Sequence, residues 1–524
     1  MKALDAVDLE LFNHRLAAVS EEMGVVLRRA GFSPNIKERR DFSCAVFDAA
    51  GRMVTHAAHI PVHLGSTPLS VKAAIDAVEM EPGDIVILND PYAGGTHLPD
   101  VTLVAPVYLP GIDRPYAYLA DRAHHADIGG NSPGSMSLSS EIHQEGFRMP
   151  PVHLCRGGRM VRETRELFLA NTRVPDERLG DLDAQIAALR AGDARVHDLA
   201  ERFGPDGLAS AMAELQAYSA RLIRAFAGEL PTGRWAAEDW LDDDGLGSGP
   251  VPIRVCVARR GSRIDVDFEG SASQVDGPLN ANLAVTTSAV FYVIACLAGR
   301  TVPPNSGMME PVHIHAPIGS IVNCSFPAAV AGGNVETSQR IVDVLLRALA
   351  PALPERIPAA SCGSMTNVTL GGHDPVRGRH FSYYETVGGG AGAGPSGDGA
   401  SAVQTHMTNT LNTPVEILES YYPLRVVHYR IRRGSGGQGE HRGGDGIDRE
   451  IEVRARAEVS LLAERRDRGA YGLGDAGEGR PGRDTIVQSG KRRRISAKSR
   501  VRLEPGDRLR VETPGGGGWS RPRH

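Results

Sequence analysis

Hydrophobic residues in the first quarter of the chain follow two different periods. Between residues 7 and 30 they recur every three or four positions, and the run ends at Gly31. This spacing predicts an amphipathic helix with a glycine stop. Short apolar runs bounded by turn residues then follow at 43–57, 81–90, 101–109 and 115–124. These runs predict β-strands, the last two being neighbours in one sheet.

The rest of the chain switches between helical and strand-like patterns. Helical spacing predicts helices at 176–229, 284–298 and 336–350, and alternation predicts strands at 234–270. Residues 388–400 form a long glycine-rich loop, and after residue 424 short apolar runs are separated by Gly and Arg. No internal repeat and no run of strand–helix–strand units is present, which argues against a doubly wound Rossmann fold.

These patterns predict a multi-lobed α+β fold with mixed β-sheets. We expect a metal-site α+β lobe at 1–175 and a helical insert at 176–230. An α+β lobe with the glycine-rich loop should follow at 231–423, and a β-rich, glycine-rich C-terminal region at 424–524. A chain of 524 residues is longer than one hydrophobic core usually serves, so several lobes are expected on length alone.

Composition limits the partners and the compartment. Lys+Arg 58 against Asp+Glu 63 gives a net charge of -5, which provides no electrostatic reason for a nucleic-acid or membrane partner. The basic run at 491–500 is the exception, and its alternation predicts an exposed hairpin edge. Six cysteines without a C-x-x-C pair, and no apolar leader or membrane-length segment, predict a soluble cytoplasmic protein with unpaired thiols.

Two short loops carry the candidate chemistry. His97 and Asp100 form an H-x-x-D after one predicted strand, and His124, His125 and Asp127 form an H-H-x-D after a later one. Imidazole and carboxylate groups are suitable ligands for Zn, Mn or Fe, so the two strand ends predict a divalent-metal site. Adjacent residues on a strand point to opposite sides, so only one of the two neighbouring histidines should be a ligand. The other histidine, or Asp127, would then position water or a ligand ring.

Other polar clusters have weaker alternatives. His59 and His63 would share a helical face, but Pro61 favours a loop with substrate-facing side chains. The 388–400 loop lacks the features of a nucleotide fingerprint, although its backbone N–H groups, those of Gly389 and Gly390 included, remain candidates for holding phosphate. Two further candidates for substrate binding are His406 and Asn409, and two polar residues at the start of a helix, Glu336 and Thr337, are interpreted as its cap.

Taken in order, the motifs resemble those of the hydantoinase B/oxoprolinase family, the relatives of the acetone carboxylase large subunit. The resemblance covers essentially the whole chain and rests on ERRDFSCAVFDAAGRMV, NDPYAGGTHLPDV, RAHHADIGG, SSEIHQEGFRMPPV, GGNVETSQR, GGGAGAGPSGDGA, THMTNT and LLAERR. It implies a B-type subunit of an ATP-dependent enzyme that opens hydantoin, N-methylhydantoin or 5-oxoproline rings. A separate hydantoinase A-like subunit would bind ATP and phosphorylate the cyclic amide, and this chain would complete the hydrolysis in a hetero-oligomer.

The resemblance also implies a ligand set. Carried over to this sequence, the metal ligands are Glu38, His97, Asp100 and His124, with Glu38 included on the resemblance alone. His125 and Asp127 are then the expected catalytic residues that position the attacking water. Two alternatives stay open: a subunit of an acetone- or acetophenone-type carboxylase, and a scaffold of such a complex without catalysis.

Overall fold

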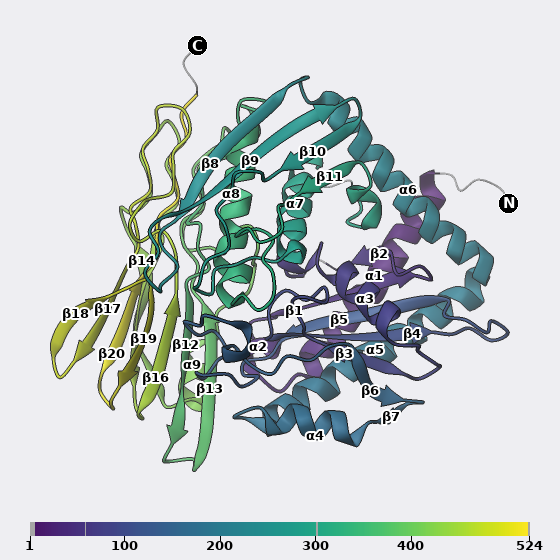
Figure 1. The fold of residues 1–524 in the computed structure, drawn as a ribbon, viewed down its shortest axis with the longest axis horizontal. Helices are drawn as coiled ribbons and strands as arrows, with labels where there is room; N and C mark the ends of the chain where they lie inside the picture. The colour runs from purple at the N-terminus through teal and green to yellow at the C-terminus, as the bar shows by residue number, and fades with distance from the viewer. Residues whose placement is uncertain (1–5, 58, 300–301, 522–524) are drawn as a thin grey trace.

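A seven-stranded antiparallel sheet organises the N-terminal part of the protein. The computed structural model describes residues 6–57, 59–299 and 302–521. The sheet has the order β2-β1-β5-β4-β3-β6-β7 (Figure 1). Its strands are β1 (Phe42–Asp48), β2 (Met53–His56), β3 (Ile85–Leu88), β4 (Asp100–Val107), β5 (Ala117–His124), β6 (Val152–Arg156) and β7 (Arg159–Met160).

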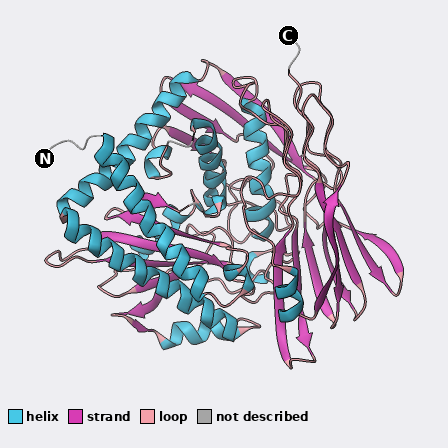
Figure 2. Ribbon diagram, turned by 180° about the vertical axis from the view of Figure 1, so that it is seen from behind, coloured by secondary structure: helices cyan, strands magenta, loops and turns pink. Residues whose placement is uncertain are grey.

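Both faces of this sheet are buried. Long helices cross its back (Figure 2), where α1 (Ala6–Ala30) and α5 (Pro175–Phe203) pack against side chains such as Leu103 and Leu119. Because both faces are covered, the central strands bury their side chains on both sides, including charged ones such as Asp121 and Arg122. The remaining helices of this part are α2 (Pro34–Lys37), α3 (Thr67–Ala77), α4 (Arg162–Ala170) and α6 (Pro205–Glu229), with 3₁₀ turns at Pro61–His63 and Ile142–Gln144.

A second sheet and two buried helices form the middle of the molecule. The sheet has the order β11-β10-β9-β8, in which β10 and β11 are parallel. Its strands are β8 (Arg234–Leu241), β9 (Val251–Arg260), β10 (Arg263–Asp267) and β11 (Val312–His315). Beside it stand α7 (Leu283–Ala298), a 3₁₀ turn (Ser306–Met309), a π-helix (Gly333–Thr337) and α8 (Ser338–Leu349). Their side chains share one core with the front face of the first sheet.

The C-terminal part is a pair of sheets that share an apolar core. One has the order β13-β12-β16-β19 and the other β14-β15-β20-β17-β18 (yellow-green at the left of Figure 1). The elements are β12 (Asn367–Asp374), β13 (Arg379–Thr386), α9 (Val415–Tyr421), β14 (Leu424–Arg432), β15 (Gly446–Val453), β16 (Ala457–Leu462), β17 (Arg483–Gln488), β18 (Lys491–Ile495), β19 (Lys498–Leu503) and β20 (Arg508–Glu512).

The predicted α+β class with mixed sheets is confirmed, while two details of the organisation differ from the sequence pattern. Strands β12 and β13 pair with β16, so one sheet extends across the expected boundary at residue 424. The helical segment 176–230 coincides with α5 and α6, but α5 packs directly on α1 and on the first sheet and so forms part of its layer. No helix in the described ranges combines the length and apolarity needed to cross a bilayer.

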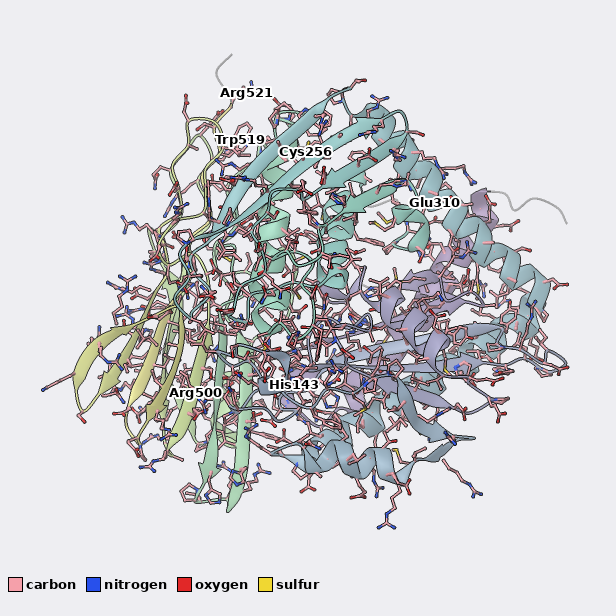
Figure 3. The ribbon with its side chains drawn as sticks, in the orientation of Figure 1. His143, Cys256, Glu310, Arg500, Trp519 and Arg521 are labelled. Atoms are coloured by element: carbon pink, nitrogen blue, oxygen red, sulfur yellow. The ribbon has the colours of Figure 1, made fainter. Side chains whose placement is uncertain are left out.

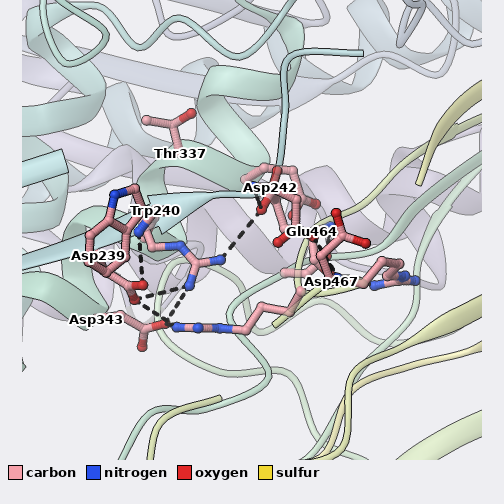
Figure 4. Close-up of polar contacts among 12 residues, drawn as sticks. Asp239, Trp240, Asp242, Thr337, Asp343, Glu464 and Asp467 are labelled. Carbon is pink, nitrogen blue, oxygen red and sulfur yellow. Dashed lines mark hydrogen bonds and ion pairs between the residues drawn. The ribbon is translucent and has the colours of Figure 1, made fainter. Parts of the chain in front are cut away.

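Buried ion pairs join the C-terminal sheets to the middle of the molecule (Figure 4). The Arg465 guanidinium donates to Asp239 on β8 at 2.9 Å and to Asp343 on α8 at 2.7 Å. Nearby, the Lys498 ammonium donates to Glu464 at 2.6 Å. Buried charges are tolerated when each one is paired and hydrogen-bonded, so this network fixes the relative positions of three elements.

Candidate metal centre

Strand pairing brings the two predicted loops together. Asp100, the first residue of β4, lies directly opposite His124, the last residue of β5. His97 lies in the loop that enters β4, and the three side chains form a buried group whose ligand atoms all lie within 4.8 Å of one another. Asp100 Oδ1 is 3.2 Å from His97 Nε2 and 3.3 Å from His124 Nδ1.

Two asparagines hold the loop that carries His97. The Asn282 side chain, at the N-terminus of α7, donates to the carbonyls of Pro91, Gly95 and Thr96, each at 3.0 Å. Asn89 donates to the Leu98 carbonyl at 2.8 Å. Because these carbonyls are satisfied by fixed side chains, the loop keeps His97 in one position without regular secondary structure.

His63 also belongs to this group, on the far side of Asp100. Its Nε2 is 3.3 Å from Asp100 Oδ2, and its Nδ1 is 2.8 Å from the Ser43 hydroxyl. The residue ends the 3₁₀ turn that begins at Pro61 and is fully buried. The predicted loop at Pro61 is therefore a single tight turn, and it aims His63 at the carboxylate of the site.

A small cavity of about 20 Å³ adjoins these side chains, which is room for about one water molecule or one ion. Asp41, Asp100, His124 and Asn334 are among the residues that line it. Both ring nitrogens of His97, Nε2 of His124 and the amide oxygen of Asn334 are buried without a hydrogen-bond partner. Buried polar atoms normally have partners. The unpaired atoms of His124 and Asn334 on the cavity wall, together with those of His97 in the adjoining ligand group, therefore fit the requirements of a bound cation.

The protonation states also fit a cation. Burial lowers the pKa of His63 and of His124, so both imidazoles are neutral near pH 7 and keep a lone pair. Burial alone would raise the pKa of Asp100, but His97 and His63 hold it well below its ordinary value. Burial raises the pKa of Asp41, and Asp100 adds to this effect. A divalent cation between two buried carboxylates would offset the cost of their burial.

Tyr384 forms part of the cavity wall, and the charged Arg39 side chain packs on its ring. The Tyr384 ring stacks on His124 with centroids 4.4 Å apart, and the Arg39 guanidinium lies 4.8 Å from the same ring. The Tyr384 hydroxyl donates to Asn367 at 3.0 Å, and Asn367 donates to Glu336 at 2.7 Å. This chain fixes the ring that orients His124. The Glu336 carboxylate therefore accepts a hydrogen bond from Asn367, and it does not cap α8 as the sequence suggested.

Glu38, His125 and Asp127 lie outside this cavity. Glu38 is the half-buried residue that follows α2 and is absent from the cavity wall, where Asp41 from the same motif stands instead. His125 points to the other face of the sheet, as the alternation predicts, and its Nε2 is 2.9 Å from Gln185 of α5. These positions favour a packing role for His125 in place of the predicted catalytic one.

Asp127 shapes a turn. Its carboxylate accepts from the backbone N–H of Gly129 at 3.0 Å and of Gly134 at 3.2 Å, and from the Arg173 guanidinium at 3.0 Å. These donors occupy both carboxylate oxygens. The residue therefore fixes the loop after β5 and does not reach the cavity to position water there.

Three further side chains predicted to bind substrate, those of His59, His406 and Asn409, lie in two different places. His59 and Asn409 lie together, since the Asn409 amide donates to the His59 carbonyl at 3.1 Å, and both line a separate surface pocket. His406 lies elsewhere, with Nδ1 3.4 Å from the Tyr292 hydroxyl and Nε2 3.6 Å from Asp343. His406 therefore contacts the buried ion-pair network and not the cavity.

The N–H groups of Gly389 and Gly390 in the glycine-rich loop are not free to bind a phosphate. Within 388–400, the N–H of Gly389 donates to the Val403 carbonyl and that of Gly390 to the Pro514 carbonyl, both at 3.0 Å. The segments 388–400, 435–446 and 514–519, which we call the glycine lattice, exchange further backbone hydrogen bonds of this kind. The expectation of anion binding by Gly389 and Gly390 is therefore corrected, because backbone carbonyls already accept from both N–H groups.

Glycine is needed in this lattice because neighbouring backbones lie unusually close. A Cβ on Gly390 would stand 1.9 Å from the Gly444 carbonyl oxygen and 2.4 Å from the Gly516 nitrogen. At the end of the lattice the Trp519 ring (upper left in Figure 3) stacks on His441 with centroids 5.9 Å apart. The glycines thus serve chain packing.

Comparison with known proteins agrees with the order of the motifs. The family model described as hydantoinase B/oxoprolinase matches residues 5–522. The chain belongs to this family. It is 38% identical to 5-oxoprolinase 1 of Arabidopsis thaliana over 98% of its own length, but it spans only 42% of that relative. It is 30% identical over its full length to a protein of Pseudomonas sp. NS671 that is named as one subunit of a D-/L-hydantoinase, and it covers 91% of that protein.

Two solved structures share the fold of this hydantoinase B/oxoprolinase family member. The ATP-dependent caprolactamase from Pseudomonas jessenii superimposes with a TM-score of 0.91 at 27% identity, and the match covers 100% of this chain and 93% of that one. Acetone carboxylase superimposes with a TM-score of 0.89 at 16% identity, covering 98% of this chain and 75% of that one. The second likeness is one of fold alone.

Proposed function

We propose that this chain is the hydrolytic, B-type subunit of an ATP-dependent enzyme that opens cyclic amides of the hydantoin, N-methylhydantoin or 5-oxoproline class. The observation that carries the proposal is the buried His97–Asp100–His124 group beside a cavity of about 20 Å³. The names of the 5-oxoprolinase, hydantoinase and caprolactamase relatives support a cyclic-amide substrate. We expect ATP to be used by a hydantoinase A-like partner in a hetero-oligomer.

In this proposal His97, Asp100 and His124 hold a divalent cation, Zn, Mn or Fe. Asp41 replaces the predicted Glu38 as the second carboxylate. When bound, such a cation supplies Lewis acidity, which makes a water molecule a better nucleophile near neutral pH. The residues around it have separate tasks. His63 holds the second oxygen of Asp100, and the Tyr384 ring fixes the plane of His124.

Phosphorylation of the cyclic amide by the partner would give a chemical reason for dividing the reaction between two subunits. An amide carbonyl is a poor electrophile, and phosphorylation of its oxygen makes the carbon more electrophilic, so that water can add there. The ring C–N bond then breaks, with the nitrogen leaving as the protonated amine, and the resulting acyl phosphate is hydrolysed by a second water to carboxylate and phosphate. The cavity has room for about one water molecule and lies among buried side chains, so bulk water is kept away from the ligand group. The chain's own groups then need only orient one water molecule at a time.

The test uses the complex purified with its ATP-binding partner and a panel of hydantoins, 5-oxoproline and larger lactams. ATP-dependent ring opening, lost in His97→Ala together with bound metal, is the expected result. His14→Ala is the matched control, because this histidine is exposed on α1 and, among the residues that the structure describes, forms an ion pair only with Glu10. Turnover only with a ketone and bicarbonate would replace the hydrolase by a carboxylase. Full activity of the metal-free His97→Ala complex would indicate a scaffold.

A further inference from the structure

A second pocket lies behind the cavity of the metal centre. It opens at the surface, has a volume of about 240 Å³ and lies between α1 and the residues that follow α2. Ligand pockets for drug-sized molecules begin at about 300 Å³, so this volume suits a small ring. Its position is defined by three chain segments that it shares with the metal centre.

In each shared segment, adjacent residues line different spaces: one lines the cavity and its neighbour in the chain lines the surface pocket. Asp41 lines the cavity, whereas Arg40 and Phe42 line the pocket. In the same way Ile60 lines the cavity and His59 the pocket. Thr408 and Asn409 repeat the pattern in the third segment. A single layer of backbone therefore separates the two spaces.

The pocket carries unpaired positive charge. Arg28 on α1 and Arg40 both line it and are exposed, and neither forms an ion pair within the described part of the chain. Glu21 is the one acidic residue on the wall, so the two guanidiniums leave an excess of one positive charge. Arginine binds carboxylate and phosphate groups through two parallel hydrogen bonds.

The backbone at Arg40 supports a built site. Arg40 has a φ of 57°, in the left-handed region that non-glycine residues seldom adopt. Its neighbours are held by the fold, since Arg39 is buried and donates to the Tyr384 carbonyl at 3.1 Å. Such strained positions concentrate at binding sites. Apolar Val25 and Leu411 complete the rim and would contact the carbon atoms of a ring.

We infer that this surface pocket, on the other side of the backbone layer from the metal centre, binds a small cyclic amide, and that Arg28 and Arg40 recognise an anionic group on it. The inference rests on the proposed function and makes it more specific, because it selects rings that carry a carboxylate or a transferred phosphoryl group over uncharged ones. His59 and Asn409 form the polar inner wall, as substrate-facing residues.

The test measures binding of two rings to the full-length, metal-loaded chain by titration calorimetry and saturation-transfer NMR. The probes are 5-oxoproline, which carries a carboxylate, and 2-pyrrolidinone, the same ring without it. We expect 5-oxoproline to bind more tightly and Arg40→Ala or Arg28→Ala to weaken it about tenfold, while 2-pyrrolidinone is unaffected. Arg29→Ala is the matched control, since Arg29 is exposed on α1 but absent from the pocket wall.

Inorganic phosphate separates the two sources of negative charge. Competition by phosphate at concentrations similar to those of 5-oxoproline would assign the arginines to the phosphoryl group, and no competition would assign them to the carboxylate. Equal weakening of both rings, unchanged affinity in both arginine variants, or no binding of either ring would overturn the inference. Binding with these preferences but without turnover of cyclic amides by the complex would instead refute the proposed function alone.

Discussion

Replacing Gly390 by alanine tests whether the glycine lattice is a packing device. The added Cβ would stand 1.9 Å from the Gly444 oxygen, about 1.5 Å short of the 3.4 Å at which ordinary contacts begin. Both atoms that it meets, the Gly444 oxygen and the Gly516 nitrogen, are backbone, so no side chain can rotate away. Overpacking of this kind costs about 1–3 kcal/mol.

Separating the chain segments also weakens hydrogen bonds. The Gly390 N–H donates to the Pro514 carbonyl at 3.0 Å, and the Gly516 N–H donates to the Gly444 carbonyl at 2.9 Å. Each contributes about 1 kcal/mol. Together these effects predict that Gly390→Ala lowers the free energy of unfolding by about 3–5 kcal/mol.

Urea denaturation followed by tryptophan fluorescence measures this loss, because Trp519 is buried at the end of the lattice. The control is Gly228→Ala in α6, where nothing lies within 4 Å of the added Cβ. That change should be neutral or stabilising by up to about 1 kcal/mol, since alanine is the better helix former. If Gly390→Ala unfolds at the same urea concentration as the unsubstituted protein, the close-packing explanation is refuted.

Three further predictions concern the buried charged groups. Asp100→Asn should lower the metal content of the purified chain at least about tenfold, as measured by plasma mass spectrometry, and an unchanged content would refute the ligand assignment. Arg465→Met removes one of the two guanidiniums that pair with both Asp239 and Asp343, the other being Arg340, and should destabilise the protein by about 1–3 kcal/mol in urea denaturation; a loss under about 1 kcal/mol would contradict the pairing. Burial raises the pKa of Glu145 from 4.5 to about 7, so the folded state holds this proton more tightly and the associated stability is lost as pH rises from 4.5 to 7. Glu145→Gln should therefore remove roughly 3 kcal/mol of this pH dependence from the free energy of unfolding, and an unchanged pH profile would contradict the assignment.

The grouping of His97, Asp100 and His124 could be predicted because it depends on local order in the chain. Two consecutive antiparallel strands bring the start of one beside the end of the next, and the H-x-x-D and H-H-x-D motifs mark those two ends. Strand alternation also predicts that only one of His124 and His125 faces the site, and the family resemblance selects His124. For these residues short-range pattern and tertiary position agree.

Other positions depend on contacts that no local pattern reports. The family resemblance favours Glu38 over Asp41 in the same motif, and only the pairing of β1 with β5 shows which carboxylate faces inward. The role of Gly390 depends on Pro514 and Gly444, which stand far away in the sequence. A glycine-rich stretch has the same composition whether its N–H groups face a ligand or another chain segment. His63 gives a partial signal, since Pro61 marks the turn but not its direction.

Because of Asn282, the metal centre depends on a residue outside the N-terminal part of the protein that carries its ligands. Residues 1–230 contain each imidazole and carboxylate of the metal centre, yet the loop around His97 is held by an amide from α7. A fragment restricted to the first sheet and its helices would keep the ligands and lose the clamp. Metal affinity should therefore report on the docking of the middle helices, and any cation bound there would tighten that docking by mass action.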